Sequence, residues 1–532
     1  MPPDLRHPGS IPGSTAPPPD RPPLMRDRSD NGNRLIQAVL EQVHAHPLAL
    51  LLLFAAAVRI VAALTPGFHH PDAIYQYLEP AHRLLTGDGL TTWEWRVGMR
   101  SWLLPTLLAV PMALGRWLGS TQDLALALPR IAVALASLGI VWAAFSIGLR
   151  VSRATGALAG FVAAGWFEFV HFGAQTLAEP VAVAAFLPAA ALLMRDRAGR
   201  TALAMAGALL ALAAMLRPHY APACLVLLLV ARWRDLPRSI LPVVAGGLAM
   251  AAISATIDLM QGATPFAWMV ENLRQNVVEH RADRYGIAPR FAFIAWYVTM
   301  WSWWAIPLLI GVRIGFRHAP ALVVAAIVNL VLHSLIGHKE YRFVFLTTAA
   351  LVVVSAIGWG EMLRLVANRW PQPRLHLATV TIWAAWAAAS LLLASGPTMA
   401  GIRSEGRAGT ILFADIRHDA DACGVAVVED ATFADIPGTA SLRRDQSLTI
   451  FAARDPGYGT GGMREALADA RPLYDRVVTS GRMAPMLPPG YVSHHCEAWD
   501  GTRLCLFARP GQCRSSRGSR FAGNTALRRL NF

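Results

Sequence analysis

The sequence predicts an α-helical membrane protein with many spanning helices, followed by a small soluble domain. Hydrophobic residues make up 54% of the 532 residues and charged residues only 15%, which is too apolar for a surface that faces water throughout. Apolar runs of about the 20 residues that a helix needs to cross a bilayer recur along the chain. The arginines between these runs gather in every second loop.

The apolar runs predict about 11 to 12 transmembrane helices within residues 47–396. The runs are 47–65, 131–150, 155–171, 177–194, 201–216, 220–232, 239–257, 291–312, 319–336, 343–363 and 375–395. A shorter run, 102–118, contains two prolines. Residues 1–46 are rich in proline and arginine without apolar periodicity, so we expect a disordered tail. The tail lacks the features of a cleaved signal peptide, so we expect the first helix to be retained.

The arginines predict how the helices are oriented, because short cytoplasmic loops collect positive charge. Five loops carry these arginines: Arg150 and Arg153; Arg195, Arg197 and Arg200; Arg232, Arg234 and Arg238; Arg313 and Arg317; and Arg364, Arg369 and Arg374. The intervening loops, 66–101, 172–176, 217–219, 258–290 and 337–342, are therefore expected on the opposite side, with the residues from 397 onward. This alternation requires that 102–118 does not span, and we expect it to be re-entrant.

Residues 397–532 predict a small extracytoplasmic soluble domain of α/β or mostly β structure. Short runs such as GVAVVED and RLCLFARP alternate with turn residues and are typical of strands. Cys496 and Cys505 have the separation of a hairpin pair, and a disulfide between them would suit an oxidising compartment. The cysteine spacing does not fit a zinc site, and GYGTGG at 457–462 lacks the strand and helix that a phosphate loop needs.

The net charge of +14 is a poor indication of nucleic-acid binding. The charges are spread over loop ends, and no compact basic domain is present. Membrane topology explains them better, so nucleic acid is not expected as a partner.

The loop 66–101 concentrates residues that chemistry needs. Asp72 follows Pro71 at an N-cap position, and apolar residues recur after it at helical spacing. We expect a short amphipathic helix that lies on the outer membrane face and ends near Gly87 and Gly89.

Three other loops predicted on the same side carry polar residues that solubility does not require. They contribute Glu179; Arg217 and His219; and His338, Lys339, Glu340 and Arg342. Lys339 is the only lysine among 48 basic residues. A flexible ammonium suits a phosphate oxygen as a point charge, which predicts an anionic ligand at this loop.

The block HPDAIYQYLEPAH…GDGLTTWEW…RSWLLP, together with HKEYRF, resembles the family 22 glycosyltransferases. These are dolichol-phosphate-mannose-dependent mannosyltransferases with a GT-C membrane fold, and the branch that acts in GPI-anchor synthesis looks most similar. The resemblance covers roughly 45–365. The usual motif is H-P-D-E, and Ala73 stands at the position of its Glu, which leaves the role of that Glu unfilled here.

The resemblance implies an inverting transfer of a mannose-like sugar from a polyprenyl- or dolichyl-phosphate donor to a glycan or glycolipid acceptor, with no metal or other cofactor. Such a step needs one general base and cationic groups that stabilise the departing phosphate. Asp72 matches the base. Lys339, His338 and Arg342 match the segment that contacts the phosphate, with Arg217 as a further candidate. The expected substrate contacts are His70, Glu179, Trp93, Trp95 and Glu340.

Several residues also have simpler interpretations. Asp72 could be only a helix cap, and Glu79 is expected to solvate its helix or pair with Arg83. Arg59 either extends outward to the interface or contacts a phosphate. Three tryptophans are expected in an interfacial aromatic belt rather than at a substrate: Trp301, Trp303 and Trp304.

A transporter or lipid flippase is the alternative function, since it would also need many helices and few buried charges. The one-sided polar loops and the lack of an internal repeat favour the enzyme. The alanine- and arginine-rich composition suggests a bacterial cytoplasmic membrane with a periplasmic site. In a eukaryote, the same orientation would place the site in the lumen of the endoplasmic reticulum.

Overall fold

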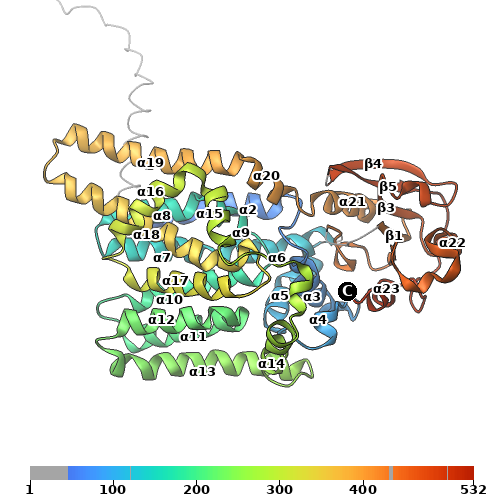
Figure 1. Cartoon of the computed structure of the whole chain (residues 1–532), viewed down its shortest axis with the longest axis horizontal. Helices are drawn as coiled ribbons and strands as arrows, with labels where there is room; N and C mark the ends of the chain where they lie inside the picture. The colour runs from blue at the N-terminus through green and yellow to red at the C-terminus, as the bar shows by residue number, and fades with distance from the viewer. Residues whose placement is uncertain (1–45, 120–121, 430–434, 500) are drawn as a thin grey trace, which may run out of the picture. The chain divides into compact units, whose positions relative to one another are not determined.

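A computed structural model describes residues 46–119, 122–429, 435–499 and 501–532. The tail predicted to be disordered lies outside the described residues except for His46. Most of the chain is helical, and a smaller sheet region follows the last long helix (Figure 1).

Six helical stretches among the described residues are long and apolar enough to cross a membrane, and five shorter apolar helices accompany them. The six stretches are Pro47–Leu64, Gln122–Leu149, Leu236–Met260, Ala292–Gly315, Tyr341–Ala367 and Gln372–Ser395. The shorter ones are Leu103–Leu118, Ala178–Leu193, Arg200–Leu216, Pro218–Arg232 and Pro320–Leu335. The predicted class of a polytopic helical membrane protein is thus confirmed.

Small residues allow neighbouring helices to approach closely. A Cβ on Gly207 of α11 (Arg200–Leu216) would lie 1.9 Å from the carbonyl oxygen of Val243 in α13 (Leu236–Met260). A Cβ on Gly358 of α18 (Phe345–Ala367) would lie equally close to the carbonyl oxygen of Gly311 in α16 (Ala305–Gly315). Such packing replaces the hydrophobic driving force that helices lack inside a bilayer.

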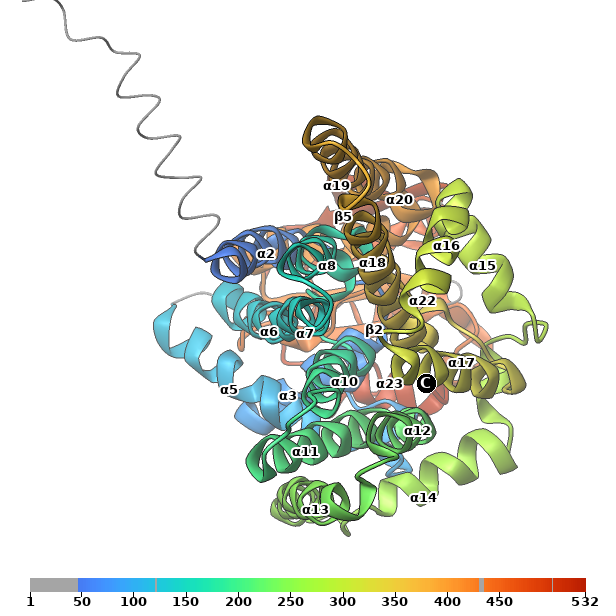
Figure 2. The same cartoon turned by 90° about the vertical axis from the view of Figure 1, so that its left-hand side faces the viewer.

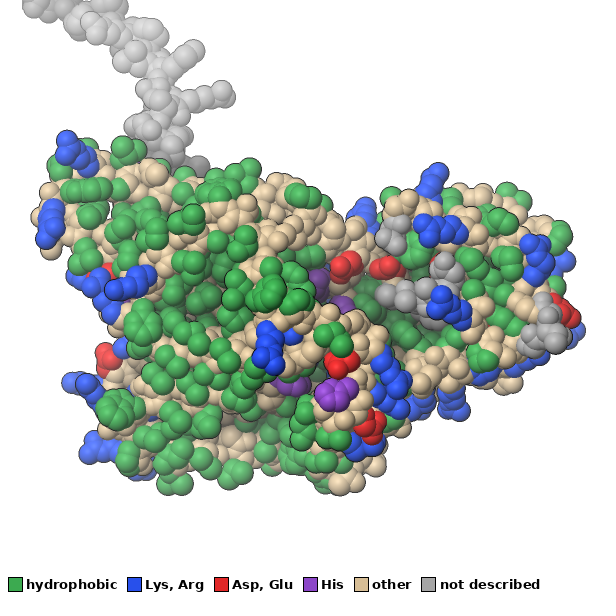
Figure 3. All heavy atoms as spheres, in the orientation of Figure 1, with side chains coloured by type: hydrophobic (Ala, Val, Ile, Leu, Met, Phe, Trp, Pro, Cys, Tyr) green, Lys and Arg blue, Asp and Glu red, His purple; other side chains and the backbone are tan. Residues whose placement is uncertain are grey.

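The five arginine-rich loops meet at one end of the helices. Arg150 binds the Asp196 carboxylate and the carbonyl of His318, each through one guanidinium nitrogen. Arg232 donates to the carbonyls of Leu193 and Arg195, which joins the second loop to the third. Arg317 and Arg364 both bind Glu361. The space-filling view shows arginine side chains in blue at the left-hand end and a largely hydrophobic helical surface (Figure 3).

The re-entrant course expected for 102–118 is not found. Leu103–Leu118 (α5) is one continuous helix that keeps Pro111 in its interior. Leu104 near its start lines the same cavity as Asp72. Beyond its end, Asp123 binds Arg417 and His418 of the C-terminal region. Both ends of α5 therefore lie near residues predicted on one side, so the helix needs no break to satisfy the alternation.

One polar group inside the helical part, Arg59, has a structural role that the sequence did not predict. Arg59 of α2 (Pro47–Leu64) is fully buried and donates to the carbonyls of Ala163 and Ala164. It thus satisfies carbonyls at the end of α8 (Arg153–Gly165) and neither reaches the surface nor faces a phosphate.

The expected tryptophan belt is also only partly found. Trp301 is buried and donates to Glu168, and Trp304 is buried as well, whereas Trp303 is 57% exposed. The two buried indoles belong to the helix core, and only Trp303 is placed to face lipid.

The sheet region has an α/β fold with five strands in the order β2-β1-β3-β5-β4. The strands are β1 (Gly424–Glu429), β2 (Ser447–Ala452), β3 (Arg476–Ser480), β4 (Val492–Trp499) and β5 (Thr502–Ala508). β2, β1 and β3 are parallel, whereas β3, β5 and β4 are antiparallel. The helices α21 (Arg407–His418), α22 (Gly462–Asp469) and α23 (Gly523–Arg529) accompany the sheet.

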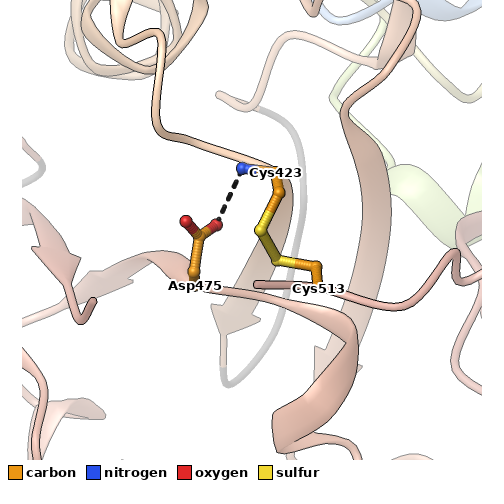
Figure 4. A group of neighbouring side chains, drawn as sticks. All are labelled: Cys423, Asp475 and Cys513. Atoms are coloured by element: carbon orange, nitrogen blue, oxygen red, sulfur yellow. Dashed lines mark hydrogen bonds between the residues drawn. A yellow bond between two sulfur atoms is a disulfide. The ribbon is translucent and has the colours of Figure 1, made fainter. Parts of the chain in front are cut away.

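Two disulfides join cysteines of the sheet region. Cys496–Cys505 links the antiparallel pair β4 and β5, as the hairpin separation predicts. Cys423–Cys513 spans 90 residues and was not predicted. Asp475 accepts a hydrogen bond from the backbone of Cys423 beside this second bridge (Figure 4). Because the two sulfurs are bonded to each other, this group holds no thiolate for a metal.

Candidate active site

A cavity of about 680 Å³ lies where the predicted catalytic loop, the ends of several helices and the sheet region meet. The loop 66–101 lines it with His69, His70, Asp72, Trp93 and Arg100. The turn between α11 and α12 (Ala221–Arg232) adds Arg217 and His219, and the loop after α17 (Pro320–Leu335) adds His338, Lys339, Glu340 and Arg342. Glu405 and Asp435 close the wall from the C-terminal region.

The loop 66–101 is folded into the body of the protein. Ala73–Leu78 forms a π-helix, and Glu79–Thr86 (α3) continues it as an α-helix that ends at Gly87. The expected helix is therefore found and ends at Gly87 as predicted, but every residue of its π-helical first half is buried, so that half does not lie on the surface. The predicted apolar positions pack instead against α5 and the sheet region. A π-helical turn is rare and is found mostly at functional sites.

Asp72 stands at the N-cap position of this helix, but its side chain makes no capping hydrogen bond. Its Oδ2 instead accepts a hydrogen bond from Nη2 of Arg342 at 2.6 Å. Its Oδ1 lies 3.3 Å from Nδ1 of His70. The capping interpretation of Asp72 is therefore not supported, and its carboxylate, 19% exposed, faces the cavity.

Arg342 holds three carboxylates at once. Besides Asp72, its Nη1 donates to Glu179 at 3.0 Å and its Nε donates to Glu340 at 2.5 Å. Glu179 is fully buried and does not line the cavity, but its carboxylate holds Arg342 in position. A guanidinium whose three nitrogens each bind a carboxylate is a fixed scaffold more than a free phosphate ligand.

The charge on this network keeps Asp72 ionised. Burial alone would raise the pKa of Asp72, but the positive charges of Arg342 and His70 outweigh burial and lower that pKa well below its ordinary value. The same balance lowers the pKa of Glu340. Nε2 of His338 lies 2.9 Å from Glu340, which raises the pKa of His338 in spite of burial. At neutral pH, Asp72 is therefore ready to accept a proton.

Two further arginines line the cavity, and the protein does not satisfy all of their donors. Arg217 lies 3.3 Å from Glu179 through Nη1 and stacks 4.8 Å over the Phe343 ring, while its Nε has no hydrogen-bond partner. Arg100 lies 3.6 Å from Glu94, and its Nε also lacks a partner. Sequence reasoning did not single out Arg100, because nothing local distinguishes it from Arg96 of the same loop.

Lys339 lines the cavity, but its ammonium is occupied. Nζ donates to the carbonyl of Ala288 at 3.1 Å and to the carbonyl of Ile336. Burial and the charge of Arg290 lower the pKa of Lys339. The sole lysine thus ties the loop 337–342 to the segment before α15 (Ala292–Trp301).

The two predicted tryptophans differ in position. Trp93 lines the cavity, and its Nε1 donates to the Tyr285 hydroxyl at 2.7 Å. Trp95 does not line it and packs against Trp102 with ring centroids 4.5 Å apart. Only Trp93 is placed to touch a substrate.

Glu79 binds the sheet region instead of Arg83. Its carboxylate accepts hydrogen bonds of 2.6 Å from the backbone nitrogens of Leu90 and Ala440 and from the Thr439 hydroxyl. Arg83 donates to Thr91. The pairing of Glu79 with Arg83 predicted from their spacing is therefore wrong.

The C-terminal region contributes a further carboxyl that sequence reasoning missed. Oε2 of Glu405 lies 3.4 Å from Nδ1 of His69, and the Glu405 carbonyl accepts a hydrogen bond from the Phe68 nitrogen. Burial, with the charges of Asp435 and Glu340, raises the pKa of Glu405 to about 8. Nothing in the surrounding sequence marks Glu405 as part of the site.

The structure brings most of the predicted residues together. The four residues expected to converge, Asp72, Glu179, Arg217 and Lys339, come from four separate segments; three line one cavity, and Glu179 binds Arg342 and Arg217 directly. Trp95 alone of the predicted site residues lies outside this network. The arrangement can take a proton at Asp72 and offer cationic donors to an anion nearby.

Several curated proteins are similar in sequence to this chain. GPI mannosyltransferase 3 of Yarrowia lipolytica is 30% identical over 333 residues, which are 58% of this chain and 61% of that protein. GPI mannosyltransferase 3 of Drosophila melanogaster is 28% identical over 56% of this chain and 54% of its own length. The human GPI alpha-1,2-mannosyltransferase 3 is 25% identical over the same shares. The chain thus spans a little over half the length of these relatives.

Among solved structures, ArnT from Cupriavidus metallidurans bound to undecaprenyl phosphate is similar, with a TM-score of 0.55 and 14% identity over 86% of this chain and 97% of that one. This likeness shows the fold, which is of the predicted GT-C type. The model of the Alg9-like mannosyltransferase family matches residues 50–400. Since that segment is more than half of the chain and contains nearly all of the cavity wall, the chain belongs to the Alg9-like mannosyltransferase family.

Proposed function

We propose that the protein is an inverting mannosyltransferase that moves mannose from a polyprenyl-phosphate donor to a glycan or glycolipid acceptor. The observation that carries this proposal is an ionised Asp72 facing a cavity that also holds arginine donors, in a chain of this family. The relatives named above are mannosyltransferases, and the similar ArnT structure contains undecaprenyl phosphate.

The reaction follows from the placement of the charges. The acceptor oxygen attacks the anomeric carbon while the bond from that carbon to the donor phosphate breaks. Asp72 takes the hydroxyl proton, and Arg217 and Arg100 stabilise the negative charge that the phosphate acquires. One displacement inverts the anomeric configuration. Asp72 is a weak base, because its pKa is lowered. We therefore expect the bond to the phosphate to be largely broken in the transition state, which requires a good leaving group such as a phosphate.

A lipid donor has a route to the cavity along α14 (Ala267–Leu273) and the π-helical turn that follows it. Trp268, Asn272 and Asn276 line the cavity. Val270 and Leu273 on the same segment are 71% and 58% exposed. One face of the segment thus suits a sugar phosphate, and the other suits acyl or polyprenyl chains.

We further propose that the cavity faces away from the cytoplasm. The five arginine-rich loops contact one another at one end of the helices, whereas the cavity is lined from the loops that alternate with them. In a bacterium this is the periplasmic face of the cytoplasmic membrane, and in a eukaryote it is the lumen of the endoplasmic reticulum. The reaction as written needs no metal ion or other cofactor.

Replacement of Asp72 by Asn tests the proposal. Transfer from polyprenyl-phosphate mannose should fall by about 10²–10⁴-fold, the usual contribution of a general base, with the protein still folded and membrane-inserted. Asp469→Asn in the sheet region is the matched control, because Asp469 is 57% exposed and lines neither this cavity nor the second one described below. Transfer by Asp72→Asn within a few fold of the parent would remove Asp72 from the mechanism.

A further inference from the structure

A second cavity of about 590 Å³ lies between the far half of the loop 66–101 and the sheet region. It is lined by polar residues from three stretches of sequence: His82 to Leu90, Thr439 to Leu448 and Cys513 to Thr525. The active-site cavity is lined by neighbouring residues of two of these segments, Thr92 to Glu94 and Asp435. The two cavities are therefore adjacent along the same boundary.

The second cavity is strongly basic. Four arginines line it, Arg443, Arg444, Arg514 and Arg517, against the acids Asp88 and Asp445. Arg443 is committed to the fold, since it donates to the carbonyls of Arg417, Asp419 and Ala422. Arg517 lies 3.3 Å from Asp88. Among the residues that the structure describes, the guanidinium groups of Arg444 and Arg514 have no hydrogen-bond or ion-pair partner.

Hydroxyl groups accompany the arginines. Ser515, Ser516 and Thr525 line the cavity, and so does Ser447, whose Oγ is buried without a hydrogen-bond partner. Planar guanidinium forks and hydroxyls together match the oxygens of a phosphate group.

The backbone that carries the free arginines is anchored. The Cys423–Cys513 disulfide fixes the residue before Arg514, and the Arg514 nitrogen donates to the carbonyl of Pro472 at 2.8 Å. The bonds of Arg443 fix the residue before Arg444. Both arginines thus extend into the cavity from a positioned backbone, so no backbone ordering is needed on binding.

We propose that this cavity binds a phosphate group carried by the glycan acceptor. The proposal rests on the proposed transferase function. The second cavity borders the same loop and the same sheet region as the active-site cavity, so it is a neighbouring polar surface for the rest of a glycan whose hydroxyl lies at Asp72. Arg444 and Arg514 are the specificity-determining residues, and they select acceptors that bear a phosphate at a distance from the reacting hydroxyl.

Binding to the full purified chain in detergent tests the proposal without any donor or turnover. The probes are a phosphorylated mannan oligosaccharide, the same oligosaccharide after phosphatase treatment, and inorganic phosphate. The double variant Arg444→Gln/Arg514→Gln is compared with Arg454→Gln/Arg482→Gln, which removes the same charge from two exposed arginines outside the cavity. Thermal unfolding checks that all proteins are folded.

We expect the parent to bind the phosphorylated oligosaccharide at least tenfold more tightly than the treated one. The first double variant should lose this preference, and the second should keep it. Equal binding of the two oligosaccharides by the parent, or an unchanged preference in the first variant, would overturn the proposal. Binding of inorganic phosphate without any preference between the oligosaccharides would overturn the assignment to an acceptor. A failure of the proposed transfer reaction would appear in the Asp72 assay and leave this binding comparison readable.

Discussion

Each half of the loop 66–101 contains a carboxylate that the protein holds in place, and the pKa values of these two carboxylates shift in opposite directions. Asp72 is held by the guanidinium of Arg342 and stays ionised at the cavity. Glu79 is fully buried and is held only by uncharged donors from Leu90, Thr439 and Ala440. Its burial raises the pKa of Glu79 to about 6. The near half of the loop supplies chemistry, and the far half fastens the loop to the sheet region.

The largest expected effect comes from replacing Arg342, which holds Asp72 in the near half of the loop. Arg342→Met leaves Asp72, Glu179 and Glu340 without their shared cation. Loss of one partner from a buried ion pair costs about 3–5 kcal/mol, so we expect a sharp drop in thermal stability and no transfer. Arg284→Met at an exposed arginine is the control. A melting temperature within a degree of the parent would show that the three carboxylates do not depend on Arg342.

A pH series separates the two carboxylates, because their pKa values move in opposite directions. The pKa of Glu79 is near 4.5 in the unfolded chain and about 6 in the fold. Its contribution to stability is therefore fully present below pH 4.5 and is lost as the pH rises through about 6. The shift corresponds to about 2 kcal/mol. The lowered pKa of Asp72 stabilises the fold above its unfolded value near 3.8 and is lost only as the pH falls through the lower folded value.

The variant that exposes this difference is Glu79→Gln. We compare the unfolding temperatures of this variant and the parent from pH 4.5 to 7. The difference, variant minus parent, should increase as the pH rises, because glutamine cannot ionise. A constant difference between the two proteins across that range would mean that Glu79 does not titrate as described. Asp72→Asn should show no such trend in the same range.

The smallest expected effect concerns a single hydrogen bond of the far half. Thr439→Val removes the hydroxyl that donates to Glu79 and should cost about 1–2 kcal/mol of stability. Transfer per folded molecule to an acceptor without a phosphate should be unchanged, because Thr439 lines only the second cavity and lies outside the active-site cavity. A selective loss of transfer in a fully stable Thr439→Val protein would show that the fastening also shapes the active site.

Sequence patterns predicted the helical fold because apolar length and arginine placement are local signals. They also indicated the segments that meet at the cavity, because solubility does not require the polar residues in loops such as 337–342. Partners could not be predicted the same way. The uniqueness of Lys339 drew attention to the right loop, yet its ammonium binds carbonyls of Ala288 and Ile336, which no pattern records.

Long-range contacts account for the other differences. The spacing of Cys496 and Cys505 indicates a hairpin, whereas Cys423 and Cys513 are joined across 90 residues only because β1 and the segment after β5 are neighbours in space. Glu79 was assigned to Arg83 because four residues separate them in a helix, and its true partners come from Thr439 and Ala440. No local sequence pattern indicates Glu405 as a site residue, because only the tertiary fold brings it beside His69.

The contact between the loop 66–101 and the sheet region has a consequence for biosynthesis. The Tyr75 hydroxyl donates to the carbonyl of Ile436, 361 residues later in the chain. At roughly 5–20 residues per second of synthesis, the loop waits on the order of 20–70 s for this partner after it emerges. During that interval the helices enter the membrane with one wall of the cavity missing. A ribosome-bound chain is thus unable to bind substrate in the finished geometry, and transfer begins only after the sheet region has folded against the loop.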